Sequence, residues 1–133
     1  MKRRSQNGRS GFTLIEMMVA ITVIIILLAI AIPIFSRSIR QAKENNFKQN
    51  LETLNLAVYQ YTLDKQKAPK SIDELRSAGY ITEIPKDITG NTDWQVEEDD
   101  KTIMALGQTE GGIYAVKSAS NRVGSNGKPY SEW

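Results

Sequence analysis

The chain has 133 residues, 17 of them lysine or arginine and 15 aspartate or glutamate, and it contains neither histidine nor cysteine. The absence of both argues strongly against a zinc centre or a cysteine or serine–histidine hydrolase, so we expect a protein that is not an enzyme. No disulfide is available to compensate for a small core, and the length allows one small domain beside any membrane segment.

The first eleven residues form a basic segment that carries no acidic residue. Its cations are Lys2, Arg3, Arg4 and Arg9. Cations that precede a membrane span are retained in the cytoplasm by the positive-inside rule. Without these four cations, 13 basic residues face 15 acidic ones and the net charge changes from +2 to −2. The overall basic charge therefore gives no indication of nucleic-acid binding.

A lone carboxylate, Glu16, directly precedes twenty uncharged and mostly apolar residues, Met17 to Ser36. A helix of ~20 residues spans the ~30 Å hydrocarbon core of a bilayer, so this run predicts one membrane helix. A carboxylate at the end of such a span is costly and indicates a function that involves a partner. Pro33 removes one backbone hydrogen bond within the helix and crowds the carbonyl of Ala29, which favours a kink. A tolerated kink without a role is the alternative.

The segment from Gly11 to Phe35, GFTLIEMMVAITVIIILLAIAIPIF, resembles the start of the type IV pilin and type II secretion pseudopilin superfamily. The resemblance implies that a prepilin peptidase cuts between Gly11 and Phe12 and methylates the new amino terminus of Phe12. It implies that Pro33 marks where the helix bends or locally unwinds in the filament. It also implies that Glu16 pairs with the amino group of Phe12 on a neighbouring subunit.

Two other interpretations of this region remain open. In the first, the Glu16 carboxylate lies at the level of the lipid headgroups and has no partner on another subunit. In the other, Ala29–Ile30–Ala31 would be the cleavage site of an ordinary secretory signal. Under the prepilin interpretation the chain divides into a cleaved leader (1–11), an apolar transmembrane and filament-core helix (12–36) and an exported domain (37–133).

Beyond Arg37 the composition becomes polar, but apolar residues keep a helical spacing that extends the helix to about Gln66. One stripe of this amphipathic half is predicted to face the core: Phe47, Leu51, Leu54, Val58 and Tyr61. A second set is expected to widen the stripe against a sheet: Leu56, Tyr59 and Leu63.

Ser71–Ile72–Asp73–Glu74 forms a capping box that predicts a helix of two turns, and Gly79 is placed to end it in a left-handed turn. Residues 69–87 resemble the segment that joins stem helix to sheet in major pseudopilins, and Asp87, Gly90 and Asn91 follow the same pattern. Three strands are predicted after it, over Trp94–Glu98, Thr102–Leu106 and Gly112–Ser118. Short links favour antiparallel pairing, so we expect an α+β fold with a three-stranded sheet on the amphipathic half of the helix. The acidic run 97–100 is interpreted as a solvated hairpin tip rather than a cation site.

The C-terminal residues 120–133 have the composition of a loop. They resemble the pseudopilin loop that binds calcium in many members of the family, and the candidate ligands here are Asn121, Asn126 and Glu132. Because calcium affinity depends on ligand charge and this loop contains no aspartate, a calcium site is disfavoured. We expect a packed loop closed by Tyr130 and Trp133.

The sequence therefore predicts a filament subunit, most similar to the major pseudopilin of type II secretion. The resemblance implies several partners: copies of the chain itself, prepilin peptidase, an inner-membrane assembly platform with its ATPase, minor pseudopilins, and membrane lipid before assembly. It implies an inner-membrane protein with its C-terminal domain outside the cytoplasm. A type IV pilin of a surface fibre for adhesion, motility or DNA uptake, and a soluble secreted binding protein cut after Ala31, are the alternatives.

Overall fold

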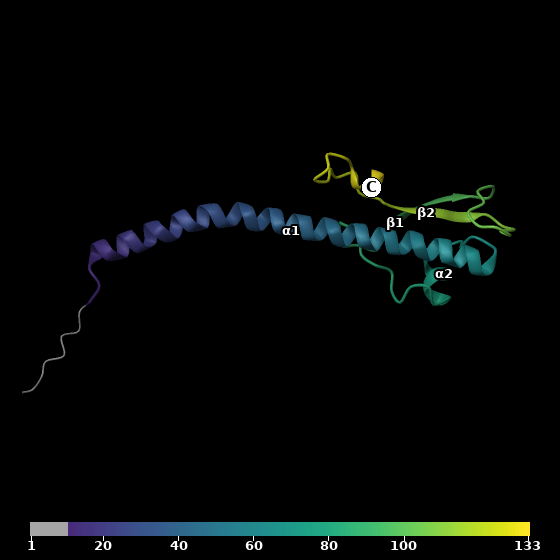
Figure 1. Ribbon diagram of the computed structural model, residues 1–133, viewed down its shortest axis with the longest axis horizontal. Coiled ribbons are helices and arrows are strands. Elements are labelled where there is room, and N and C mark those ends of the chain that lie inside the picture. Colours follow the sequence, from purple (N-terminus) through teal and green to yellow (C-terminus); the bar gives the residue numbers. More distant parts are fainter. Residues whose placement is uncertain (1–10) are drawn as a thin grey trace, which may run out of the picture. The chain divides into compact units, whose positions relative to one another are not determined.

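The computed structural model describes residues 11–133, so most of the predicted leader lies outside the described residues. The elements follow in the order α1 (Leu14–Lys65), α2 (Ile72–Ser77), β1 (Trp94–Asp99), β2 (Gly112–Ser118) and a 3₁₀ helix, η1 (Tyr130–Glu132) (Figure 1). The chain divides into two compact units, one ending at Ile39 and one running from Arg40 to Trp133. An α+β fold is therefore confirmed, although its sheet is smaller than predicted.

The first unit is the apolar beginning of α1, and the apolar side chains of this stretch are exposed. In the part of the chain that the structure describes, α1 is the one helix long and apolar enough to cross a membrane, with a mean hydropathy of 3.1 in its most apolar window. Pro33 lies inside α1 without ending it. The hydroxyls of Thr22 and Ser36 donate to carbonyls one turn earlier, at 2.8 and 3.0 Å. These bonds leave both hydroxyls paired within the helix, as a lipid environment requires.

The second unit is built on one face of α1. The predicted core stripe is confirmed, since its five side chains are at most 9% exposed. Leu54, Val58 and Tyr61 pack with Leu75 of α2 and with Ile113 of β2. The two strands lie along the part of α1 that carries this stripe (Figure 1). The amphipathic half of α1 thus provides the surface on which the rest of the unit folds.

The expectation that Leu56, Tyr59 and Leu63 widen the buried stripe is wrong. Their exposed fractions are 52%, 42% and 43%. A sheet of two strands is too narrow to cover a second face of the helix, so these side chains remain on the surface.

The predicted short helix is present as α2, with Ser71 as its N-cap. The Ser71 hydroxyl accepts a hydrogen bond from the Glu74 amide at 3.2 Å, while the Glu74 carboxylate accepts from the amide of Lys70 at 2.8 Å and from the hydroxyl of Tyr61. Gly79 follows with φ +84°, and the Tyr80 amide returns to the carbonyl of Leu75 at 2.9 Å. The start and end signals in the sequence are therefore both confirmed.

β1 and β2 pair antiparallel, with Val96 opposite Val116. Between the pairs Glu97–Ala115 and Glu98–Ile113 the register shifts, which leaves Tyr114 as an extra residue on β2. Such a bulge changes the side-chain alternation and increases the local twist. It explains why Ile113 and Val116, three residues apart, are both buried in the core.

The predicted third strand, Thr102–Leu106, is not a strand. Its backbone groups are paired by a side chain instead, because the Gln108 carboxamide accepts from the amide of Met104 at 2.7 Å and donates to the carbonyl of Thr102 at 3.1 Å. Asp99 also accepts from the amide of Lys101 at 3.0 Å, which turns the chain away from β1. A buried glutamine thus replaces the neighbouring strand as hydrogen-bond partner.

Asn55 of α1 pairs with the backbone of β2. Its side-chain oxygen accepts from the amide of Val116 at 2.8 Å, and its side-chain nitrogen donates to the Val116 carbonyl at 3.0 Å. Val116 is 2% exposed, so neither backbone group has ready access to water. The asparagine acts as a one-residue substitute for a third strand and fixes the sheet to the helix.

We expect Asn55→Ala to destabilise the second unit by about 2 kcal/mol, because it leaves a buried amide and a buried carbonyl unpaired. The melting temperature of the full chain in detergent, followed by the fluorescence of Trp94 and Trp133, should fall by roughly 8–16 °C. Asn45→Ala, at an exposed position of the same helix, is the matched control and should change little. Equal melting temperatures for the two variants would contradict the role given to Asn55.

Candidate functional site

α1 begins with a capping box formed by Thr13 and Glu16. The Glu16 carboxylate oxygen Oε2 accepts from the Thr13 amide at 2.8 Å and from the Thr13 hydroxyl at 2.9 Å, and the Glu16 amide donates back to that hydroxyl at 3.3 Å. The pattern Thr-x-x-Glu was visible in the sequence, but its capping role was missed there. The cap fixes the Glu16 carboxylate at the first turn of the helix.

The two residues at the predicted cleavage point are accessible. Phe12 is 84% exposed, and a Cβ added to Gly11 would meet nothing within 4 Å. Packing among the described residues therefore gives no reason for a glycine at position 11. The hydrogen bonds that the Glu16 carboxylate accepts from described residues both use Oε2, which leaves Oε1 as a second acceptor. Among the described residues the carboxylate of Glu16 is hydrogen-bonded to Thr13 and not to Phe12 of the same chain.

The side-chain oxygens of the two asparagines proposed as calcium ligands have separate hydrogen-bond partners. The Asn121 side-chain oxygen accepts from the hydroxyl of Ser131 at 3.1 Å, whereas that of Asn126 accepts from the amide of Lys128 at 2.9 Å. Glu132 lies in η1. Within residues 11–133 no group of three histidine, cysteine, aspartate or glutamate side chains is placed to hold a metal ion. Asn126 is a local turn acceptor, whereas Asn121 ties the start of the loop to Ser131, ten residues later.

A buried carboxylate, Glu44 of α1, holds the C-terminal loop instead. It is 2% exposed and accepts from the Ser125 amide at 2.9 Å and the Tyr130 hydroxyl at 2.8 Å, as well as from the Ser125 hydroxyl. Arg40, one turn earlier, donates to Glu44 at 3.2 Å and to the carbonyl of Val123 at 3.1 Å. Both oxygens of this buried charge are thus paired.

Glu44 was missed by the sequence reasoning, although a signal was present. It lies three residues before Phe47 and so extends the 3-4 spacing of the buried stripe by one position. A carboxylate on a buried helical stripe needs hydrogen-bond donors. Burial by itself raises the pKa of Glu44, but the hydrogen bonds from Ser125, Tyr130 and Arg40 outweigh it and lower the pKa to about 2.

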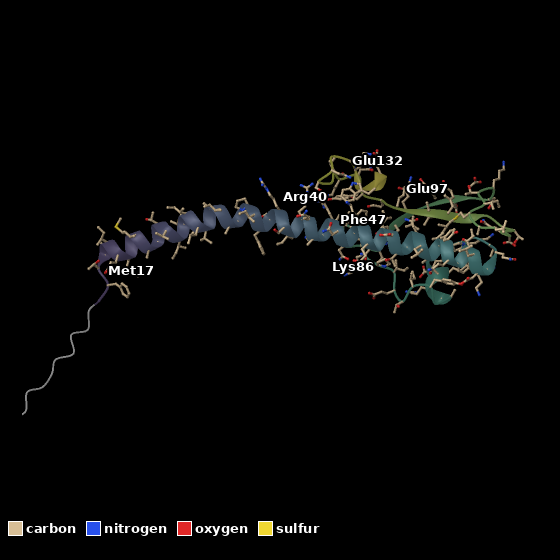
Figure 2. The ribbon with its side chains drawn as sticks, viewed as in Figure 1. Met17, Arg40, Phe47, Lys86, Glu97 and Glu132 are labelled. Atoms are coloured by element: carbon tan, nitrogen blue, oxygen red, sulfur yellow. The ribbon has the colours of Figure 1, made fainter. Side chains whose placement is uncertain are left out.

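Aromatic rings close the same loop over α1, as expected for Tyr130 and Trp133. The ring of Phe47 lies 5.5 Å from that of Tyr130, 5.9 Å from that of Trp133 and 6.0 Å from that of Trp94, centroid to centroid. Figure 2 shows Arg40 and Phe47 on α1 next to the C-terminal segment that carries Glu132. A Cβ on Gly124 would lie 2.2 Å from the ring of Trp133, so this approach requires glycine.

We expect Glu44→Gln to destabilise the second unit at pH 7 by about 2–4 kcal/mol, since charge-assisted bonds from buried donors are lost. The folded-state pKa lies below the ordinary value of 4.5. The contribution is therefore fully present above pH ~4.5 and disappears as the pH falls through about 2. Urea unfolding followed by tryptophan fluorescence should show a gap between wild type and variant that closes between pH 5 and 2. Glu52→Gln, at an exposed position of the same helix, is the control, and a gap independent of pH would contradict the assignment.

Calcium should add little stability, because the loop is already closed by Glu44 and its asparagines point to separate partners. A ligand that binds the folded state raises the melting temperature according to RT ln(1 + [L]/Kd). We expect no measurable shift at millimolar calcium against an EGTA control in the full chain. A rise of several degrees that Asn121→Ala or Asn126→Ala removes would show a calcium site.

Comparison with known proteins places this sequence in a family. Residues 6–32 match the model described as the prokaryotic N-terminal methylation motif. The chain is 33% identical over 79 residues to the competence protein ComGC of Halalkalibacterium halodurans, covering 58% of this chain and 78% of that protein. It is 30% identical over 107 residues to the type II secretion system core protein G of Aeromonas hydrophila, covering 68% of this chain and 73% of that protein. No solved structure matches the chain.

The matched motif includes Gly11 and Phe12, which precede α1, and Glu16 in its first turn. Both relatives are matched over more than two thirds of their length. The chain therefore belongs to the type IV pilin and pseudopilin superfamily, whose members are structural subunits rather than enzymes.

Proposed function

We propose that the chain is the subunit of a helical filament that is assembled from the inner membrane. It is made as a prepilin, cut between Gly11 and Phe12 and methylated on Phe12 by prepilin peptidase. The observation that carries the proposal is the start of α1, where an accessible glycine and phenylalanine precede a carboxylate fixed on the first turn of an apolar helix.

The apolar stem supports assembly independently of this site. From Met17 to Ser36 the helix carries no charged residue, and its large side chains are exposed, for example Leu27 at 61% and Phe35 at 66%. Lipid covers such a surface in the membrane. A stem extracted from lipid must be covered again, and packing against identical stems does so. One contact repeated head to tail then generates an open helical fibre.

The class of filament is proposed as a type II secretion pseudopilus. The match to the secretion system core protein G extends over 107 residues and thus into the second unit. An assembly platform with its ATPase and minor pseudopilins would be the remaining partners. A competence filament is the second candidate, and the identity of 33% to ComGC favours it. Deletion of the gene separates the two, since loss of protein export indicates the first and loss of DNA uptake the second.

The role proposed for Glu16 is to pair with the amino terminus of Phe12 on a neighbouring subunit. No lysine or arginine lies between Phe12 and Ser36, so a cation for the carboxylate has to come from a chain terminus or from outside this segment. Its free oxygen Oε1 is available for this pair while Oε2 keeps the cap with Thr13. The axial register of an incoming stem would be set by the same contact.

We expect Glu16→Gln to leave cleavage and membrane insertion intact but to reduce filament yield at least 100-fold. Glutamine also serves in a capping box, so this change keeps the helix start and removes the charge. Loss of one member of a buried ion pair costs ~3–5 kcal/mol. Filaments are measured by shearing and immunoblotting, and the mature amino terminus by mass spectrometry.

Two further variants serve as controls for this experiment. Gly11→Leu should leave uncleaved precursor, because a peptidase site that accepts glycine leaves little room for a branched side chain. Thr13→Ala removes the cap without removing the charge and should have the smaller effect on yield. Filaments at wild-type level with Glu16→Gln would refute the pairing. A mature terminus at Ile32 would refute prepilin processing altogether.

A further inference from the structure

A row of apolar side chains on α1 faces away from the core of the second unit. It comprises Leu56, Tyr59 and Leu63, spaced three and four residues apart, and we call it the α1 stripe. Their exposed fractions lie between 42% and 52%. Thr53 and Gln60, which flank the stripe on one side of the helix, are uncharged. No described element of the same chain covers this apolar surface.

A second exposed apolar group lies on the loop between β1 and β2. Leu106 is 99% exposed and Ile103 is 60% exposed, and we call this pair the loop knob. A leucine with nearly its whole side chain in water loses the ~1.5–3 kcal/mol that burial provides. Neither side chain contributes to the core clusters of the unit.

The loop that carries the knob is held in a defined conformation by hydrogen bonds. Gln108 is 9% exposed, and its carboxamide makes four hydrogen bonds to the loop backbone. It accepts from the amides of Met104 and Ala105 at 2.7 and 3.4 Å, and it donates to the carbonyls of Thr102 and Glu110 at 3.1 and 2.9 Å. Gly107 turns the chain with φ +85°. The same framework that buries Gln108 therefore holds Leu106 outward.

We propose that the loop knob of one copy of this chain packs on the α1 stripe of a second copy. The inference rests on the proposed function, because it assigns a contact between subunits of the filament. Each copy carries one knob and one stripe, and they are different surfaces. Their contact is therefore heterologous and repeats from copy to copy, as an open helix requires.

The loop knob is attached to its own chain at a point ten residues past Leu56. Thr109 donates its amide to the carbonyl of Gln66 at 2.7 Å, and a Cβ on Gly107 would lie 3.2 Å from the Gln66 side chain, so the knob's loop is attached just past the end of α1. Leu56 is ten residues earlier, or ~15 Å along a helix axis. A disulfide needs Cα atoms within about 7 Å. When the two cysteines are placed on different chains, a disulfide between positions 56 and 106 necessarily joins two copies.

The test uses the natural absence of cysteine from the chain. Leu56→Cys and Leu106→Cys are expressed together in cells that assemble filaments, and mild oxidation precedes non-reducing electrophoresis. We expect dimers from the mixture and none from either variant alone. The two changes in one chain should give a ladder of multimers. Glu83→Cys with Leu106→Cys is the control, because Glu83 is exposed elsewhere on the unit.

A second measurement asks whether the contact matters for assembly. Leu106→Asp should reduce the yield of sheared filaments about tenfold while leaving the melting temperature unchanged, since the side chain is exposed. Leu106→Met keeps the apolar knob and should assemble normally.

The outcomes separate this inference from the proposed function. Normal filaments without 56–106 crosslinks would refute the knob contact and leave the filament proposal standing. Normal filaments from Leu106→Asp with loss of export or DNA uptake would assign the knob to a different protein and also refute the contact. If the wild-type chain forms no filament at all, both proposals fail.

Discussion

The second unit depends on one face of one helix being covered. The stripe from Phe47 to Tyr61 presents a row of large apolar side chains that α1 cannot bury by itself. A two-stranded sheet is equally unable to stand alone in water. When the sheet and α2 pack against this buried row of side chains, one core covers the apolar face of the helix and supports the sheet. Asn55 and Glu44 then supply polar contacts that orient what the apolar surface attracts, because hydrophobic contact is non-directional and hydrogen bonds are not.

α1 carries two carboxylates in apolar surroundings, Glu16 and Glu44, and they differ in how many hydrogen-bond donors their own chain supplies. Glu44 is 2% exposed, and the Ser125 amide, the Tyr130 hydroxyl and Arg40 of the same chain pair with it. Glu16 is exposed and receives two donors from Thr13 on one oxygen only. A buried charge that its own chain satisfies is a structural element. A charge at the end of an apolar stem, satisfied on one side, is suited to a contact with another molecule. The difference lies in the remaining hydrogen-bonding capacity rather than in residue type.

The parts of the fold that could be predicted are those governed by short-range chemistry. Helical spacing identified the buried stripe, and Ser71 with Gly79 gave the limits of α2. The errors arose where a distant side chain replaced a backbone partner. Gln108 pairs the backbone of Thr102–Leu106, a segment whose composition suits a strand. The bulge at Tyr114 broke the alternation from which the buried face of β2 would be read. Because periodicity describes only local geometry, neither Gln108 nor Glu44 could be assigned a partner without the tertiary structure.

Under the proposed function the chain exists as a free subunit and in a fibre, and a weak contact between subunits suits both states. The proposed free subunit has to diffuse in the membrane without aggregating, so no single exposed patch on its second unit should bind strongly. The α1 stripe and the loop knob are each only two or three side chains, which limits the free energy of one such contact to a few kcal/mol at most. Once the apolar stems of two copies are held side by side, the contact between the loop knob and the α1 stripe becomes effectively intramolecular. It then gains from the high local concentration of its partner. The small apolar patches are then not a defect of packing, because the burial that their side chains lack in the monomer would be regained in the proposed fibre.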